Sequence, residues 1–210
     1  RGPKPSGGKR EGAGDTGSGE ASGAHAQAPA RAQGGAGHDG SAWVWDLETG
    51  GGCRLAVTAD GAPCSPDGGR TCPNVHQALF SPDGRWLLTT SSDPEQPVRL
   101  WDPLACGPLD GAPAHGDGGS GVQAAAVSKG PGGATLVATG DDGGGVRVMR
   151  MNSAGVWSPV CAEQWHTNVV TDVAFSPDGR WLASASEDGS AAVTALTDHG
   201  CATPRYLEPQ

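Results

Sequence analysis

The stretch LFSPDGRWLLTT at residues 79–90 returns as AFSPDGRWLASA at residues 174–185, and the two copies are 95 residues apart. A weaker copy, AVSKGPGGATLVAT, lies midway between them at residues 126–139. The repeat spacing is therefore about 47 residues, and a period in the forties is typical of repeat architectures in which each repeat is one small supersecondary unit.

Each copy carries the same order of strand and turn signals. In the last copy, Val169, Thr171, Val173 and Phe175 alternate with other residues, which predicts a strand with one apolar face. A Pro-Asp-Gly turn follows, because Pro fixes φ and Gly accepts the left-handed conformation. A second strand, an Asp-rich or Gly-rich turn and a third strand complete the copy. The predicted third strands are residues 98–102, 146–150 and 192–195, with a fourth example upstream at residues 41–46.

These phrases resemble the WD-repeat family of β-propellers, whose repeats form four-stranded blades. Trp45-Asp46 and Trp101-Asp102 carry the dipeptide of the family, and Trp165-His166 resembles its Gly-His position. The resemblance implies an all-β fold, a β-propeller of four-stranded antiparallel blades that is incomplete in this chain. The implied domain spans residues 38–210, with blades at about 38–58 (partial), 73–112, 120–164 and 166–207.

Two segments fall outside this pattern. Residues 1–37 contain no Leu, Val, Ile or aromatic side chain, so they bury too little apolar area to offset the entropy of ordering. We expect a disordered N-terminal tail there. Residues 59–72 form an insertion with its own Ser-Pro-Asp-Gly at 65–68, and we interpret that copy as a loop because no strand pattern follows it.

In the family, a His, a Ser or Thr of the second strand, the turn Asp and the Trp form a buried hydrogen-bonded set. The resemblance implies His166, Ser184 or Ser186, and Asp188 for the last blade, where Thr194 replaces the Trp. In the blade that ends at Trp101, Thr71 stands in the position of the His. The residues predicted to be structural are Trp45, Asp46, Asp93, Trp101, Asp102, His166, Ser184, Ser186 and Asp188.

No catalytic, cofactor or metal motif accompanies the repeats. The chain lacks the G-x-x-x-x-G-K-[ST], H-E-x-x-H and G-x-S-x-G patterns, and its six His residues never fall at metal-ligand spacing. A G-x-G-x-x-G match at residues 12–17 has no strand before it and no helix after it, so it is a coincidence of a Gly-rich tract. We predict no catalytic residue, no cofactor and no metal.

The six cysteines form no C-x-x-C pair, and we expect them to be free thiols in a reducing compartment. That expectation favours an intracellular, cytoplasmic location. No apolar run approaches the roughly 20 residues needed to cross a bilayer. The net charge of −9 argues against nucleic acid as a partner, since phosphate binding needs a basic stripe.

Family members often touch their partners through residues that flank the start of the first strand and through the residue before the turn Asp. The matching positions in this sequence are Ser92, Asp141, Asn168, Val170 and Glu187. Asp141 and Glu187 are acidic, which favours basic peptide segments as ligands. The Trp-Asp-x-Arg motif that binds a cullin adaptor is absent at residues 45–48 and 101–104, so nothing supports that partner.

The sequence therefore favours a non-catalytic scaffold that mediates protein–protein interactions. One alternative is a regulatory or sensor propeller of a longer enzyme, such as a kinase-linked chain. A second alternative is a trafficking component, and a third is a degenerate array that folds poorly. Four blade equivalents do not readily close a propeller of this family, so we also expect that further blades lie outside this chain.

Overall fold

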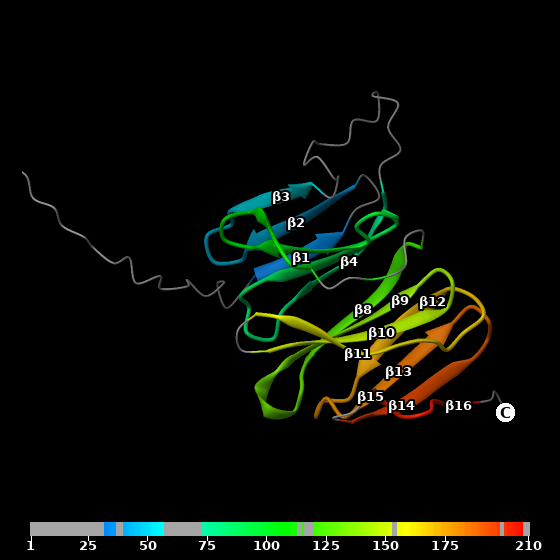
Figure 1. Cartoon of the computed structure of the whole chain (residues 1–210). Helices are drawn as coiled ribbons and strands as arrows, with labels where there is room; N and C mark the ends of the chain where they lie inside the picture. Colours follow the sequence, from blue (N-terminus) through cyan, green and yellow to red (C-terminus); the bar gives the residue numbers. More distant parts are fainter. Residues whose placement is uncertain are drawn as a thin grey trace, which may run out of the picture.

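The computed structural model describes residues 32–36, 40–56, 73–112, 115, 120–152, 155–197 and 200–207. In these ranges the chain is all-β, apart from a short 3-10 helix at Pro131–Gly133. None of the described segments forms a helix long and apolar enough to cross a membrane. Four antiparallel sheets follow one another in sequence order and lie side by side, from the β1–β3 sheet to the sheet of β12–β16 (Figure 1). The predicted fold class is confirmed.

We call these sheets blades 1 to 4. Blade 1 contains β1 (Ala32–Ala36), β2 (Ser41–Asp46) and β3 (Gly52–Ala56). Blade 2 contains β4 (Val75–Phe80), β5 (Leu87–Ser91), β6 (Val98–Asp102) and β7 (Gly107–Leu109). In both blades neighbouring strands along the chain are also neighbours in the sheet.

Blades 3 and 4 follow the same up-and-down order. Blade 3 contains β8 (Val122–Lys129), β9 (Thr135–Asp141), β10 (Gly145–Met151) and β11 (Trp157–Gln164). Blade 4 contains β12 (Val170–Phe175), β13 (Trp181–Ser186), β14 (Ala191–Thr197), β15 (Gly200–Cys201) and β16 (Arg205–Leu207). The short strands β15 and β16 both pair with β14, so together they fill the position of the fourth strand.

The repeated Ser-Pro-Asp-Gly-Arg-Trp phrase builds the same turn in blades 2 and 4. In blade 2, Ser81 Oγ donates to Asp83 Oδ1 at 2.6 Å and accepts the Trp86 N–H at 3.1 Å. In blade 4, Ser176 Oγ makes the equivalent bonds to Asp178 at 2.5 Å and from Trp181 at 3.0 Å. The Gly of each turn has a φ near +70°, a conformation that a side chain disfavours.

Successive residues of a strand face opposite neighbours, and this alternation holds the blades together. Leu87 and Trp101 of blade 2 share a buried cluster with Val44 of blade 1. Trp86 and Leu88, on either side of Leu87 in the sequence, share a second buried cluster with Val137 of blade 3. Burying one such side chain stabilises the fold by about 2 kcal/mol. Because blade 2 buries both of its faces, it depends on both of its neighbours.

The Trp86 ring lies edge-on to Trp157 of blade 3, with centroids 6.0 Å apart and an interplanar angle of 69°. Trp86 therefore packs between blades 2 and 3.

One strand lies within the segment predicted to be a disordered tail. Residues 32–36 form β1, which pairs with β2 along its full length from Ala32↔Asp46 to Ala36↔Ala42. A strand pairs through backbone groups, so a run of Ala, Gln and Gly can form one without large apolar side chains. The prediction of disorder is therefore wrong for 32–36. The rest of the predicted tail, residues 1–31 and 37, and the insertion at 59–72 lie outside the described residues.

Two disulfides join the blades near their outer strands. Cys53 on β3 pairs with Cys106, which precedes β7, and their Cα atoms are 6.1 Å apart. Cys161 on β11 pairs with Cys201 on β15, with a Cα separation of 5.7 Å. The expectation of free thiols is wrong for these four residues. Their sequence separations of 53 and 40 residues gave no sign of pairing, because only stacking brings the outer strands together.

Opening these bridges should destabilise the stack. Disulfides that close loops of this length stabilise proteins by roughly 3 to 4 kcal/mol. We therefore expect reducing agent to lower the free energy of unfolding in urea by several kcal/mol. A Cys161→Ser/Cys201→Ser variant lacks one of the two bridges, so its free energy of unfolding should be lower than that of the oxidised wild type. Reducing agent should lower it further by less than it lowers that of the wild type. Equal urea midpoints for the oxidised and reduced wild-type protein would contradict the stabilising role.

Candidate functional site

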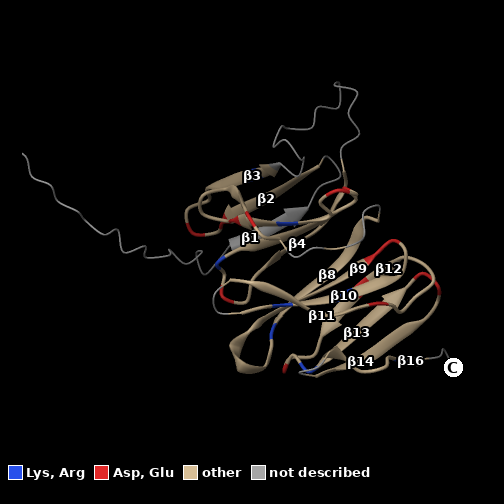
Figure 2. Cartoon of the chain, in the orientation of Figure 1, with Lys and Arg blue, Asp and Glu red and all other residues tan. Residues whose placement is uncertain are grey.

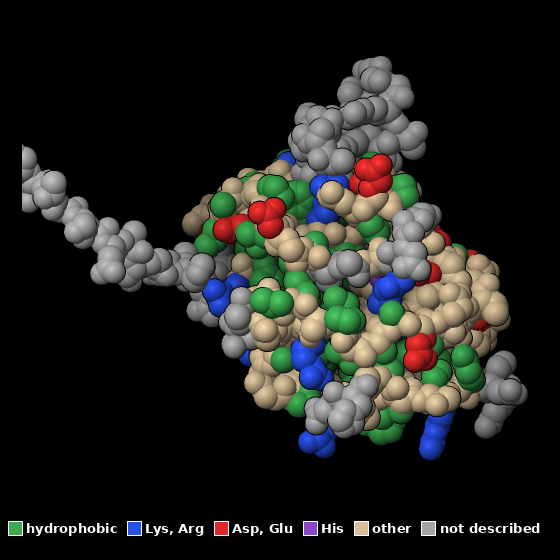
Figure 3. Space-filling view, viewed as in Figure 1, with side chains coloured by type: hydrophobic (Ala, Val, Ile, Leu, Met, Phe, Trp, Pro, Cys, Tyr) green, Lys and Arg blue, Asp and Glu red, His purple; other side chains and the backbone are tan. Residues whose placement is uncertain are grey.

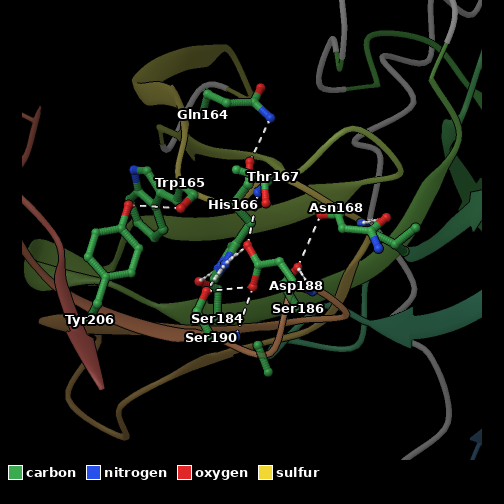
Figure 4. Close-up of polar contacts among 12 residues, drawn as sticks. Gln164, Trp165, His166, Thr167, Asn168, Ser184, Ser186, Asp188, Ser190 and Tyr206 are labelled. Atoms are coloured by element: carbon green, nitrogen blue, oxygen red, sulfur yellow. Dashed lines mark hydrogen bonds and ion pairs between the residues drawn. The ribbon is translucent and has the colours of Figure 1, made fainter. Parts of the chain in front are cut away.

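His166 is the centre of a polar network where the chain enters blade 4 (Figure 4). Its side chain is buried, and both ring nitrogens have partners: Nδ1 lies 2.8 Å from Ser190 Oγ, and Nε2 lies 2.7 Å from Ser184 Oγ. Asp188 completes the network by accepting the Thr167 N–H at 2.9 Å and the Ser190 hydroxyl at 2.6 Å. The network fastens the β13–β14 turn to the segment that precedes β12.

The other residues near this network occupy different places. Ser186 accepts the Asp188 N–H at 3.1 Å and donates to the Asn168 carbonyl at 3.1 Å, so it braces the turn without contacting the imidazole. Tyr206 was not predicted; its hydroxyl donates to the Trp165 carbonyl at 2.8 Å. Tyr206 lies beyond the third strand, where the repeat pattern carries no signal for it.

Blade 3 has a second His-centred network. His115 reaches it from the preceding connection and bonds to Thr139 and, at 3.3 Å, to Asp141 Oδ2. Asp141 Oδ1 also accepts the N–H groups of Gly143 at 2.9 Å and Gly145 at 2.7 Å. Asp141 is therefore buried and fully used within its blade, and the structure does not support its predicted place on a partner-binding surface.

Hydrogen bonding keeps the network carboxylates ionised. A hydrogen bond from the Ser190 hydroxyl, aided by the Thr167 N–H, holds the pKa of Asp188 well below its ordinary value. For Asp141, burial is the largest influence and raises the pKa. Hydrogen bonds from His115, Gly145 and Gly143 outweigh it, so the pKa of Asp141 also lies below its ordinary value. These charged acceptors are committed to internal donors.

The Trp-Asp dipeptides serve structural roles in blades 1 and 2. Trp101 is buried and donates from Nε1 to Thr89 Oγ1 at 2.9 Å, while Trp45 is 39% exposed. Asp102 and Asp46 each accept two backbone N–H groups of the turn that follows their strand.

Asp93, the turn residue of blade 2, has its carboxylate 3.3 Å from Arg99 Nη2. The blade 2 position of the His, Thr71, lies outside the described residues.

The end of the blades at which the chain enters each first strand is the candidate interaction surface. We call it the entry edge; it comprises the turns at 91–97, 141–145 and 186–190 and the connection at 165–169. Three equivalent backbone bonds define it: Ser92 N to Asn74 O, Asp142 N to Gly121 O, and Glu187 N to Val169 O. The equivalence identifies Asp142, not Asp141, as the blade 3 counterpart of Ser92 and Glu187.

The strand pairing explains this one-residue error. Val137 pairs with Val127 and Leu182 pairs with Phe175, which aligns Asp142 with Glu187. Aligning the two Asp-Gly turns, as the sequence invites, shifts blade 3 by one residue.

The residues predicted to bind partners differ in exposure. Val170 is fully buried, and a Cβ added at Gly140 would lie 2.4 Å from its Cγ1, so it is part of the junction between blades 3 and 4. Asn168 and Glu187 are exposed, and Ser92 is half-buried with its Oγ accepting the Asn74 N–H. Asp142 is half-buried; its Oδ1 is itself buried and, within the described structure, has no hydrogen-bond partner. The entry edge therefore exposes Asn168 and Glu187, with Ser92 and Asp142 half-buried beside them.

The entry edge is acidic. Figure 2 shows acidic residues at the turn after β9 and at the turn after β13, on the same side of the molecule. Asp142, Glu187 and the exposed Glu95 are the acidic residues of the entry edge whose side chains take no part in the contacts above. Among the described residues, no group of three His, Cys, Asp or Glu side chains gathers to hold a metal ion. The surface chemistry suits recognition of cationic groups.

Comparisons with known proteins agree with this architecture. The family model "WD domain, G-beta repeat" matches residues 65–94 and 157–193. The second match begins on β11 of blade 3 and continues through β12 and β13 into β14 of blade 4, so one sequence repeat spans a blade junction. The first match begins within the insertion that we interpreted as a loop.

Three curated proteins share parts of the sequence. The target of rapamycin complex subunit wat1 of Schizosaccharomyces pombe is 35% identical over 107 residues, which cover 51% of this chain and 32% of wat1. The LST8 homolog of Drosophila melanogaster is 30% identical over 135 residues, which cover 59% of this chain and 36% of that protein. The HIR1 protein of Candida albicans is 60% identical over 30 residues, or 14% of this chain and 3% of HIR1. The chain thus spans about a third of the first two proteins.

Acid should weaken the protein through the network carboxylates. The pKa of Asp188 is lowered on folding, so between that value and its unfolded value of about 4 the unfolded state binds more protons. The stability that Asp188 contributes is complete above about pH 4 and is lost as the pH falls below it. We expect Asp188→Asn to flatten the decline of the free energy of unfolding from pH 4 to pH 2, measured by urea titration.

Glu187→Gln is the matched control, because this neighbouring side chain is exposed and lies outside the network. The control should keep the acid dependence of the wild type. An Asp188→Asn protein with an undiminished pH dependence would show that the network does not hold this carboxylate ionised.

Proposed function

This chain belongs to the WD-repeat family, and we propose from that premise that it is a non-catalytic scaffold that docks protein partners on its entry edge. The observation that carries the proposal is that some acidic side chains of the entry edge are hydrogen-bonded within the blades and others are not. Internal hydrogen bonds occupy the carboxylates of Asp141 and Asp188, whereas Glu187 is exposed and Asp142 is half-buried, with a buried Oδ1 that has no partner among the described residues. Loops held by a rigid scaffold are favoured places for binding groups.

The favoured ligand is a basic segment of a partner protein. Asp142 and Glu187 occupy equivalent positions in neighbouring blades, where their backbone N–H groups are anchored by equivalent bonds. An extended Lys- or Arg-containing segment lying across the two blades would meet one carboxylate from each. Asn168 supplies an exposed amide beside Glu187, and Ser92 lies at the same position in blade 2. The negative net charge of the chain would also steer a cationic partner.

We further propose that the partners belong to a multiprotein assembly. The relative wat1 is, by its name, a subunit of the target of rapamycin complex. A comparable subunit role for this chain is consistent with an array of blades whose described residues offer recognition loops and hold no cluster of metal-ligand side chains.

An intracellular location stays part of this proposal. The disulfides between Cys53 and Cys106 and between Cys161 and Cys201 favour an oxidising compartment instead. Trapping thiols in the cells that make the protein, followed by peptide mapping, separates the two. Free thiols at these positions would support the intracellular location, and bridged cysteines would overturn it.

The binding proposal can be tested with a defined cationic probe. A fluorescent peptide of nine alternating Lys and Gly residues should bind the wild type with a salt-dependent affinity, followed by anisotropy. Replacing the two acceptors in Asp142→Lys/Glu187→Lys should weaken binding about tenfold or more, since charges at the rim of an interface govern encounter and selectivity. The thermal midpoint should stay near that of the wild type.

A triple variant at the opposite end of the blades controls for net charge. Glu48→Lys/Leu104→Lys/Val156→Lys makes the same total change in charge on exposed residues, in the turns after β2, β6 and β10. It should leave the affinity within about twofold of the wild type, apart from long-range screening. Equal losses in the two variants, or no binding of the probe to the wild type, would refute the entry edge as the docking surface.

A further inference from the structure

The two ends of the blade array carry exposed residues whose counterparts in the inner blades are buried. We call the side of each blade that meets the next blade along the chain its forward face, and the opposite side its backward face. Within the described residues, the forward face of blade 4 and the backward face of blade 1 have no blade against them. The internal junctions show what each of these faces is built to contact.

The forward face of blade 4 is an uncovered copy of a buried one. Trp86 and Trp181 follow the same Gly-Arg pair and lie 95 residues apart. Trp86 is 6% exposed, because blade 3 covers it and brings Trp157 against its ring. Trp181 is 50% exposed. The same side chain in the same turn is therefore covered inside the array and open at its end.

The backward face of blade 1 is open in the same way. Trp45 and Trp101 occupy the same position of the third strand, each directly before an Asp. Trp101 is 3% exposed and shares a buried cluster with Ala42 and Val44 of blade 1. Trp45 is 39% exposed and stacks on Trp43, with centroids 5.9 Å apart and ring planes 12° from parallel. Figure 3 shows hydrophobic side chains reaching the surface over the sheet of β1–β3.

The two open faces match each other as the halves of an internal junction do. Counting from Trp45 and its counterpart Thr194, Ala42 and Val44 correspond to Ala191 and Val193 of β14. The residue types that receive Trp101 in blade 1 thus recur in blade 4. The strand pairs Ala183↔Val193 and Trp181↔Ala195 place these side chains on the same face as Trp181. That face offers small residues beside one indole, and the facing surface offers two stacked indoles.

We propose that a second copy of this chain docks head to tail on these faces, with blade 1 of each copy against blade 4 of the other. Trp45 of one copy then packs over Ala191 and Val193 of the other, as Trp101 packs over Ala42 and Val44 within the chain. The blade 1 and blade 4 sheets lie at opposite ends of the array, so a single copy does not close on itself (Figure 1). Such a contact is heterologous, and two copies are the smallest assembly in which both faces of each copy are covered.

The mass of the intact 1–210 chain in solution tests this inference. Light scattering should give twice the 21.0 kDa of the chain. Trp181→Asp and Trp45→Asp each place a charge on an open face, and each should raise the dissociation constant at least tenfold, as expected for a central interface tryptophan. Val156→Asp is the matched control, because Val156 is 59% exposed between β10 and β11, away from both faces. Circular dichroism should show all three variants folded.

Mixing the two variants distinguishes this arrangement from other dimers. In a mixed dimer, the intact blade 1 of Trp181→Asp meets the intact blade 4 of Trp45→Asp, so one of the two junctions is wild type. We expect the mixture to form more dimer than either variant alone. A monomeric wild type would overturn the inference, as would a dimer that both variants leave unchanged. A mixture that gains no dimer over the separate variants would overturn the head-to-tail geometry.

Discussion

Face-to-face burial of neighbouring sheets is the constraint on which the rest of this structure depends. Short antiparallel sheets are only marginally stable by themselves, and this chain supplies large apolar side chains sparingly among 36 Gly and 17 Pro. The adjacent residues Leu87 and Leu88 show the solution: both are fully buried, one toward blade 1 and the other toward blade 3. Each strand of a middle blade serves two clusters, so few residues suffice.

Outside the apolar clusters, the polar networks hold the blades at the entry edge and the disulfides hold them at their outer strands. His166 and Asp188 tie the β13–β14 turn to the segment that enters blade 4, close to the position where Val170 packs against Gly140 of blade 3. The outer strands are joined instead by Cys161–Cys201 and Cys53–Cys106. The entry edge is rigid because its acidic turn residues are anchored on one side by such bonds. That rigidity is what makes an exposed Glu187 a usable recognition group.

The sequence predicts the elements whose signals are local. The Ser-Pro-Asp-Gly turn and the set of His166, Ser184 and Asp188 depend on residues within one repeat, and the structure contains both. The alternation predicted for β12 fails at its start, because a register shift between Val170 and Asp172 buries Val170 and leaves Thr171 exposed. Features that depend on stacking were not predictable: the cysteine pairs, the burial of Val170 and the Tyr206 bond to Trp165 arise between distant segments. The place of Asp142 was missed because strand register, not the Asp-Gly motif, sets the alignment.

Hydrogen exchange followed by mass spectrometry on the 1–210 chain tests the stacking account most directly. Amides of β5 and β9, the second strands of the blades that have neighbours on both sides, should exchange slowest and at similar rates. Amides of β2 and β14, in the two end blades, should exchange faster at protein concentrations below the dissociation constant of the proposed dimer, because within one copy each of those blades packs against a single neighbour. Fast exchange throughout β5 and β9, with no protection above that of the end blades, would contradict the account.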